Sequence, residues 1–313
     1  MAELIHDIDL NYLDTPGAAS AFLLMGDAPL LVECGPAACF DTLCDGIRGH
    51  GVKPTDIRDV VVTHIHLDHA GAAGHFARHG ARIHVHPLGV RHLVDPTKLV
   101  ESSRRVHGER YDRWYGDLLP VPSSQIREWQ DGEANLVGGL PFRAHFTPGH
   151  ARHHIAWALL TELFTGDVGA MVIPGTECIS VPTPPPEFDP PAWRDSLARL
   201  RALPPRRVWC THGGVQSDGA NYLRRAELRV NGECQALAAA LGLGDTASAD
   251  ADARYASHLN HIEHVEQVTP DQRAHFLGRA FRQMNLQGAA RAIEKGLLDP
   301  RAAPGTTPPS PTR

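Results

Sequence analysis

The stretch Thr63-His64-Ile65-His66-Leu67-Asp68-His69 decides the fold of this 313-residue chain. It directly follows the apolar segment Asp59–Val62, which we expect to be a short buried strand. Four side chains of metal-ligand type thus fall within six residues at a strand end, where a tight loop can turn them into one cavity. Clustered, partly buried imidazoles and a carboxylate are costly, and a metal ion relieves that cost by binding both groups directly. The stretch therefore predicts a metal site.

Three further motifs place a ligand-type residue beside a glycine at the end of an expected strand. They are Thr147-Pro148-Gly149-His150, Thr165-Gly166-Asp167 and Thr211-His212-Gly213-Gly214. Glycine allows the backbone to approach a neighbour closely at such positions. Each motif alone is typical of an ordinary turn, but the four motifs together, in this order, are specific.

With these motifs the sequence resembles the metallo-β-lactamase superfamily, whose HxHxDH signature is complete from His64 to His69. The resemblance runs from about residue 18 to about residue 215. It implies an α/β (α+β) fold, a four-layer αβ/βα sandwich with the metals at one edge between two sheets, here followed by a helical carboxy-terminal extension. The details are most similar to the glyoxalase II-like and lactonase-like hydrolases.

The resemblance also implies a set of ligands for two divalent metal ions. The first ion is held by His64, His66 and His150, the second by Asp68, His69 and His212, and Asp167 bridges both. Zinc is the default metal because it suits histidine and aspartate, and iron or manganese also fits this nitrogen and oxygen set.

One position, Glu33, departs from the commonest pattern of the family, which has Asp there. In the family this acidic residue supports the metal loop from behind the ligands, and such groups orient ligating imidazoles. We expect Glu33 to do the same after a small adjustment of the backbone.

Two divalent ions about 3.5–4 Å apart can share a water and lower its pKa towards neutrality. The bridging hydroxide would attack a carbonyl carbon, with Asp68 as the catalytic residue that orients it and shuttles its proton. The leading hypothesis is therefore a dinuclear metallohydrolase that cleaves an ester-like bond, in a thioester or a lactone. No GxSxG motif suggests a serine nucleophile instead.

Three other functions stay open at this point. A persulfide dioxygenase-like oxidoreductase would use one iron held by His64, His150 and Asp167. A phosphodiesterase or nuclease of the same superfamily is disfavoured because the net charge is −6 and only three residues are lysine. A non-catalytic metal-binding module is the least favoured, because the ligand set is complete.

Composition adds expectations about the setting of the protein. The amino terminus lacks the pattern of a secretory signal, and no apolar run approaches the length of about 20 residues that spans a membrane. We expect a cytoplasmic protein with a small-molecule substrate, without nucleic-acid or membrane partners, and leave a homodimer open. The six cysteines contain no CxxC pair, and we expect reduced, mostly buried thiols.

The chain is expected to contain a catalytic domain over residues 1–220, a helical extension over 221–299 that serves as a lid or dimer contact, and a disordered tail over 300–313. The expected helices of the extension are Asn221–Leu241, Asp271–Leu286 and Ala289–Leu297. His258, His261 and His264 recur near one helical face, and we favour a solvated helix there over a metal site.

Residues 97–120 are expected to be helical and to lie on the surface. Their side chains either line the substrate cleft or form a solvated helix surface, and the sequence does not choose between these interpretations. The residues concerned are Arg104, Arg105, Tyr111 and Tyr115.

Overall fold

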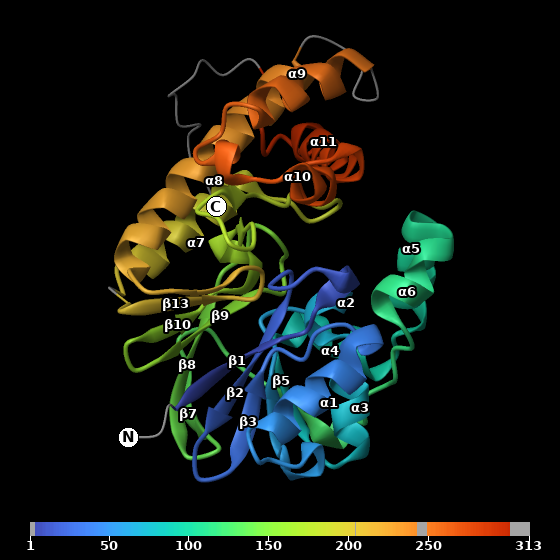
Figure 1. Ribbon diagram of the computed structural model, residues 1–313, viewed down its shortest axis with the longest axis vertical. Coiled ribbons are helices and arrows are strands. Elements are labelled where there is room, and N and C mark those ends of the chain that lie inside the picture. Colours follow the sequence, from blue (N-terminus) through green and yellow to red (C-terminus); the bar gives the residue numbers. More distant parts are fainter. Residues whose placement is uncertain (1–3, 204, 243–248, 301–313) are drawn as a thin grey trace. The chain divides into compact units, whose positions relative to one another are not determined.

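The structure is a computed structural model that describes residues 4–203, 205–242 and 249–300 (Figure 1). By its internal contacts the chain divides into two compact units. The first unit comprises Met1–Phe146, His153–Gly166 and Pro205–Gly219, and the second comprises Thr147–Arg152, Asp167–Pro204 and Ala220–Arg313. The expected extension falls in the second unit together with two earlier segments, and the expected tail lies, from residue 301 on, outside the described residues.

The first unit contains two six-stranded sheets. The strands of the first sheet are, in spatial order, β1 (Ile5–Asp9), β2 (Ser20–Met25), β3 (Pro29–Val32), β4 (Asp59–Val61), β5 (Arg82–Val85) and β6 (Ile126–Glu128). The strands of the second sheet are β14 (Gly214–Gln216), β13 (Arg207–Cys210), β10 (Glu162–Phe164), β9 (Ile155–Leu159), β8 (Leu140–Phe146) and β7 (Ala134–Val137). Gly138 and Gly139, both with positive φ, form the turn between β7 and β8.

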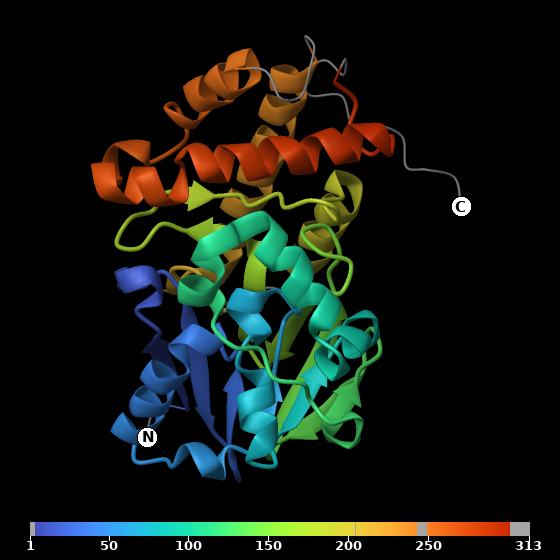
Figure 2. The ribbon, with the colours of Figure 1, turned by 90° about the vertical axis from the view of Figure 1, so that its right-hand side faces the viewer.

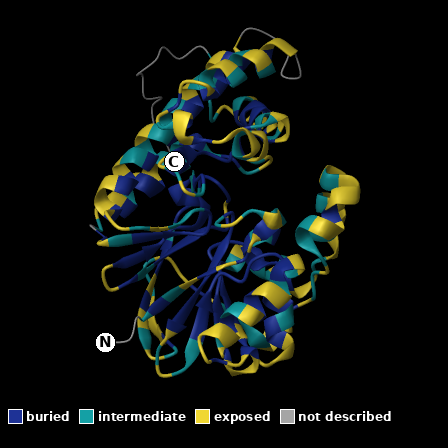
Figure 3. Cartoon of the chain, in the orientation of Figure 1, coloured by how far each residue is buried: buried dark blue, intermediate teal, exposed yellow. Residues whose placement is uncertain are grey.

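The core of this unit consists of apolar side chains from the inner faces of both sheets, and the central strands of the sheets are mostly buried (Figure 3). Trp129, which follows β6, meets Trp157 of β9 edge to face with ring centroids 5.0 Å apart. Phe22 of β2 contacts Phe164 and Trp209 of the opposite sheet. Such aromatic contacts add to the stabilisation that burial alone provides. The two sheets therefore form the expected sandwich.

Helices of the first unit connect the parallel strands of the first sheet, from β3 to β6. They are α1 (Phe40–Gly49), α2 (Leu67–Ala70), α3 (Ala73–Arg78), α4 (Val90–Val94), α5 (Thr97–His107) and α6 (Tyr111–Tyr115). The predicted helical character of residues 97–120 is confirmed for α5 and α6, and α5 has no buried residue. All six cysteines of the chain are free and buried, as expected.

The second unit is mainly helical. Its helices are α7 (Pro190–Arg201), α8 (Gly219–Leu241), α9 (Ala249–Leu259), α10 (Pro270–Phe276) and α11 (Arg279–Glu294), and its short strands are β11 (Met171–Val172) and β12 (Ile179–Ser180). Side-chain caps begin two of the helices: Asp189 accepts from the N–H of Ala192, and Thr269 forms a capping box with Gln272. No helix within the described ranges is long and apolar enough to cross a membrane.

Two of the predicted helix boundaries are wrong. The expected helix Asp271–Leu286 is interrupted at Leu277 and Gly278, where the backbone leaves the helical region, and α10 and α11 result. The expected break before Ala289 does not occur, and α11 continues as the long red helix of Figure 2. Gly288 therefore lies inside a helix, where it normally destabilises. A Cβ there would approach the carbonyl oxygen of Thr183 to 1.8 Å, so the glycine permits close packing.

Candidate metal centre

The predicted metal loop lies between β4 and α2 in the first unit. β4 ends at Val61, the chain bends at Thr63, and α2 begins at Leu67. The first two histidines of the signature meet at the start of the turn, with His64 Nε2 and His66 Nδ1 2.9 Å apart. The next two ligand-type residues lie on α2 itself, because Asp68 and His69 occupy its first turn.

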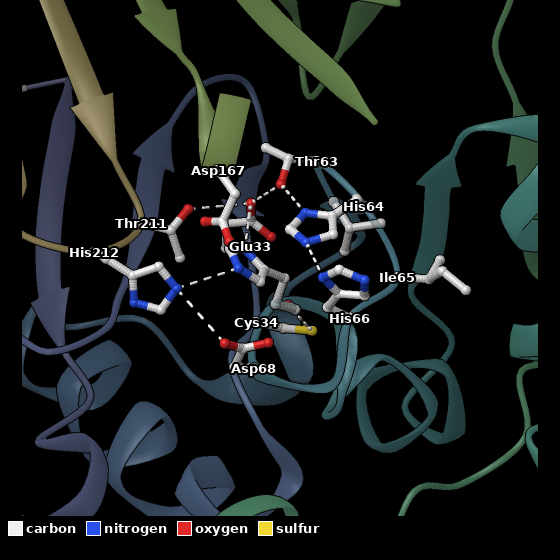
Figure 4. A network of polar contacts seen from close by, with 12 residues as sticks. Glu33, Cys34, Thr63, His64, Ile65, His66, Asp68, Asp167, Thr211 and His212 are labelled. Carbon is white, nitrogen blue, oxygen red and sulfur yellow. Dashed lines mark hydrogen bonds and ion pairs between the residues drawn. The ribbon is translucent and has the colours of Figure 1, made fainter. Parts of the chain in front are cut away.

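His212 reaches the same place from the end of β13 (Figure 4). Its Nε2 atom lies 3.3 Å from His69 Nε2 and 3.6 Å from Asp68 Oδ2. Asp68, His69 and His212 thus form a group whose candidate ligand atoms all lie within 4.8 Å of one another. The first unit therefore brings together five of the seven predicted ligands in two adjoining groups.

Hydrogen bonds to the other ring nitrogen assign the tautomers of these imidazoles. His212 Nδ1 donates to the carbonyl oxygen of Ala18 at 2.6 Å, and His69 Nδ1 donates to Glu33 Oε1 at 3.3 Å. Because Nδ1 carries the proton in both neutral rings, both Nε2 atoms have a lone pair. These two lone pairs face each other across 3.3 Å. Two acceptors at this distance repel, and a cation between them removes the repulsion.

Glu33 organises the loop from behind the ligands. It is fully buried and accepts from the hydroxyl of Thr63, from His69 Nδ1 and, at 3.3 Å, from Thr211 Oγ1. Because the Thr63 hydroxyl donates to Glu33, its oxygen accepts from His64 Nδ1 at 3.0 Å. The carboxylate therefore orients His69 directly and His64 through Thr63, as expected for this position.

The backbone at Glu33 has an unusual conformation. Glu33 has φ 65°, in the left-handed region that residues other than glycine rarely adopt. Such conformations persist only where the surroundings enforce them. Here three donors hold the side chain, which ties the strained backbone to the metal loop.

The two remaining predicted ligands, His150 and Asp167, belong to the second unit. Within that unit His150 Nε2 lies 3.3 Å from Asp167 Oδ2, and both residues are buried. His150 Nδ1 donates to the carbonyl oxygen of Pro182 at 3.1 Å. His150 therefore has the same tautomer as His69 and His212, with Nε2 available to a metal.

Two tyrosines beside Asp68 complete the surroundings. Burial raises the pKa of Tyr115, and the charge of Asp68 raises it further. Burial likewise raises the pKa of Tyr12, with smaller contributions from Tyr115 and Asp68. Both phenols therefore keep their protons at neutral pH. Sequence reasoning missed Tyr12, because nothing in its local sequence connects it with α6.

Within residues 97–120, Tyr115 and Arg104 have different surroundings. Tyr115 lies in the electrostatic neighbourhood of Asp68, and its hydroxyl is 3.4 Å from His107 Nε2. Arg104 instead pairs with Asp112 at 2.6 Å and lies over the ring of Tyr111, and its side chain is exposed. The solvated interpretation therefore holds for Arg104.

The donor set of the first unit fits a divalent metal. Neutral imidazoles and a carboxylate are ordinary ligands of zinc, and its bonds to nitrogen are about 2.0–2.1 Å long. Two adjacent nitrogen ligands on such an ion are about 3 Å apart. The separations of 2.9 Å between His64 and His66 and 3.3 Å between His69 and His212 match this spacing.

Comparison with known proteins supports the same class. The model of the metallo-β-lactamase superfamily matches residues 14–212. The chain therefore belongs to this superfamily, whose members are mostly metal-dependent hydrolases that bind divalent metals. The matched range contains all seven predicted ligands.

Among its relatives, the metallo-beta-lactamase fold-containing protein ST1585 of Sulfurisphaera tokodaii is 29% identical over 239 residues, which cover 72% of this chain and 87% of that protein. The solved structure of ST1585 superposes with a TM-score of 0.66 at 21% identity, covering 93% of this chain and 99% of the other. The structure of TTHA1429 from Thermus thermophilus superposes with a TM-score of 0.65, also at 21% identity, covering 94% of each chain. Both structures share the fold and its carboxy-terminal region.

A hydroxyacylglutathione hydrolase of Pseudomonas paraeruginosa is 31% identical over 185 residues, which span 58% of this chain and 55% of that enzyme. This similarity therefore leaves nearly half of each chain unmatched.

Proposed function

We propose that this protein is a hydrolase that cleaves an ester-like bond, in a thioester or a lactone, at a centre of two divalent metal ions. The observation that carries the proposal is the pair of Nε2 lone pairs of His69 and His212, held 3.3 Å apart beside Asp68. When both rings are neutral, a metal ion bound by both Nε2 atoms compensates the cost of burying these acceptors. The partial similarity to a hydroxyacylglutathione hydrolase supports an ester-like substrate.

We further propose that all seven predicted ligands serve this one centre, following the order of ligands in the superfamily. The first ion takes His64, His66 and His150, the second takes Asp68, His69 and His212, and Asp167 bridges the two. Each imidazole for which a backbone or carboxylate acceptor is seen on Nδ1 keeps Nε2 for a metal. Zinc suits this donor set, and iron or manganese is compatible with it.

Divalent ions at such a site supply an activated water at neutral pH and polarise a carbonyl group. Residues of the chain would transfer the proton and bind the substrate. Asp68, partly exposed at the edge of the ligand group, accepts the proton of the attacking water and passes it to the leaving group. Tyr115, whose raised pKa keeps it protonated, can donate a hydrogen bond to the substrate.

Elemental analysis of protein purified without added metal tests the proposal first. About two ions of zinc, manganese or a mixture per chain, together with turnover of a thioester or a lactone, is the expected result. One iron per chain, with oxygen consumed on a persulfide substrate, would favour the dioxygenase-like alternative. Activity on bis-p-nitrophenyl phosphate alone would favour the phosphodiesterase.

The bridging role of Asp167 has its own test. We expect Asp167→Ala to lose stable binding of one of two ions and most of the hydrolysis, because no other predicted ligand is shared. The metal content and kcat of this variant are compared with those of Asp195→Ala, which changes a carboxylate outside the ligand set. Two bound ions and full activity in Asp167→Ala would show that the assignment is wrong.

A further inference from the structure

The second unit contains a buried polar network that ends at His150. The His150 ring depends for its orientation on the carbonyl oxygen of Pro182, which accepts from Nδ1 at 3.1 Å. Pro182 belongs to an extended segment of residues 181–183, immediately after β12, and all three residues are buried. A segment without regular structure can hold a carbonyl in one place only if its own backbone is fixed.

Asn285 of α11 fixes this segment from both sides of Pro182. Its Oδ1 accepts from the N–H of Thr183 at 2.8 Å, and its Nδ2 donates to the carbonyl oxygen of Val181 at 2.8 Å. Because a backbone N–H can only donate and a carbonyl can only accept, these partners determine which way the amide faces. The side chain thus pairs with the segment as a neighbouring strand would.

A second layer holds Asn285 itself. Its Nδ2 also donates to the hydroxyl of Tyr255 at 2.7 Å and lies 3.3 Å from Glu233 Oε1. Tyr255 donates in turn to Glu233, and Arg229 pairs with the same carboxylate at 2.6 Å. Asn285, Tyr255 and Glu233 are fully buried, so these polar contacts are formed without competing water.

The close approach of α11 to the segment supports the same conclusion independently. Gly288, one turn after Asn285, is the residue whose missing Cβ lets the helix lie against the carbonyl oxygen of Thr183. Thr183 Oγ1 also donates to the backbone carbonyl of Asn285 at 3.2 Å. A helix-destabilising glycine at this position is explained by the need for this contact.

We propose that Asn285 is a positioning residue for the candidate metal ligand His150: it holds residues 181–183 so that the Pro182 carbonyl keeps the proton of His150 on Nδ1 and Nε2 available to a metal. This inference rests on the proposed metal-binding role of His150. It gives the helical extension a role in tuning the affinity of one metal site, since partners of ligating histidines commonly change affinity 10- to 100-fold.

The test compares Asn285→Ala with Leu286→Ala, which truncates a neighbouring buried residue of α11 whose apolar side chain cannot hydrogen-bond to residues 181–183. Zinc affinity is measured by competition with a chromophoric chelator, and folding by circular dichroism and Tm. We expect both variants to lower Tm. Only Asn285→Ala should lower the zinc affinity of one of two sites, by about tenfold. The zinc affinity of Leu286→Ala should stay within about twofold of that of the unsubstituted protein.

A second readout needs no metal. In metal-free protein labelled with 15N-histidine, the ring nitrogens of His150, assigned with His150→Gln, should show the Nδ1–H tautomer. Asn285→Ala should move them towards a mixture of tautomers. If Asn285→Ala does not fold, Tyr255→Phe replaces it, because it keeps the ring and removes only the hydroxyl that accepts from Asn285; a smaller weakening of the same zinc site is then expected.

The outcomes separate the two proposals. Two zinc ions bound equally well by the unsubstituted protein and the Asn285 variant, with an unchanged His150 tautomer, would overturn the positioning role and leave the proposed hydrolase intact. Equal loss of affinity in Asn285→Ala and Leu286→Ala would reduce Asn285 to a general structural role. Failure of the unsubstituted protein to bind metal would overturn both.

Discussion

Two groups of histidines in this molecule have similar spacing in the sequence and very different surroundings. His64 and His69 of the first unit are fully buried, and their Nδ1 atoms are engaged by a hydroxyl and a carboxylate. In the second unit His261, which follows the end of α9, is exposed and donates to the carbonyl of Ser257 in the last turn of that helix, while His264 lies among three glutamates.

The difference shows what makes a histidine a metal-ligand candidate. Burial makes the neutral ring favourable, and an acceptor on Nδ1 decides which nitrogen keeps its lone pair. His258, His261 and His264 have ordinary partners and form no group of candidate ligands within the described residues. The expected solvated helix holds only for His258, which lies partly exposed on α9. It is wrong for His261 and His264, because α9 ends at Leu259 and His264 has a left-handed backbone.

Removal of a buried, proposed ligand should have the largest effect on activity, and it tests the difference between the two groups of histidines. We expect His69→Ala to lower kcat/KM more than about 10³-fold, since it removes a proposed ligand and one of the buried donors to Glu33. His261→Ala should change kcat/KM less than about twofold. Steady-state kinetics of both variants on the best ester-like substrate checks this. A comparable loss in both would show that burial does not distinguish the two groups.

The next largest effect is expected from removal of metal, which should lower the stability of the protein. A ligand that binds only the folded state at 100 times its Kd stabilises by about 2.7 kcal/mol. Chelation of the purified protein should therefore lower its Tm by several degrees, and added zinc should restore it. In His69→Ala the shift should be smaller, because one site is incomplete. Scanning calorimetry with and without chelator measures the difference; identical shifts in the two proteins would argue against His69 as a ligand.

Glu33 provides a smaller change that keeps all ligands. Glu33→Gln preserves the size of the side chain but replaces a carboxylate that accepts from Thr63, His69 and Thr211. We expect zinc affinity to fall about 10- to 100-fold with the ligands unchanged. Glu133→Gln, which removes a carboxylate paired with Arg127 far from the ligand motifs in sequence, is the control. Unchanged zinc affinity in Glu33→Gln would remove Glu33 from the metal loop.

The parts of the molecule that could be predicted from sequence are those in which neighbouring residues carry the information. The metal loop and the β7–β8 turn are local patterns, since ligand-type residues or glycines follow apolar strands directly. The network around Asn285 could not be predicted. Its partners Val181 and Thr183 are more than 100 residues away in the sequence, and an asparagine inside a helix has no local signature of such pairing.

The same reason explains the misplaced helix boundaries. In the local sequence, the glycine at position 288 predicts the end of a helix. It lies inside α11 instead, because its contact with Thr183 leaves no room for a side chain. Leu277 and Gly278, where the helix does end, are followed by residues that are good helix formers. Local propensity is a weak guide where tertiary contacts compete with it.

The smallest predicted effect concerns a histidine that is buried in the first unit but has the opposite tautomer. His86 Nδ1 accepts from the N–H of Leu88 at 3.0 Å, so its proton lies on Nε2, and the ring lies tilted against that of Phe146. Burial lowers the pKa of His86 from 6.5 to about 4. His86 is therefore protonated at a lower pH in the folded protein than in the unfolded chain. The neutral ring stabilises the fold fully above pH 6.5, and this contribution is lost between pH 6.5 and about 4.

His86→Asn tests whether burial alone produces this behaviour. Asparagine keeps an acceptor for the Leu88 N–H and does not titrate. At pH 7.5 the variant should be less stable than the unsubstituted protein, because it loses the contact with Phe146. The difference in the free energy of unfolding between the two proteins should become smaller by about 1 kcal/mol on acidification to pH 5, allowing for solvent screening. Urea unfolding of metal-free protein at both pH values measures it. If this difference is the same at both pH values, the pKa of His86 is the same in the folded and unfolded states. Burial without a hydrogen bond donated by Nδ1 would then not be enough to keep these histidines neutral.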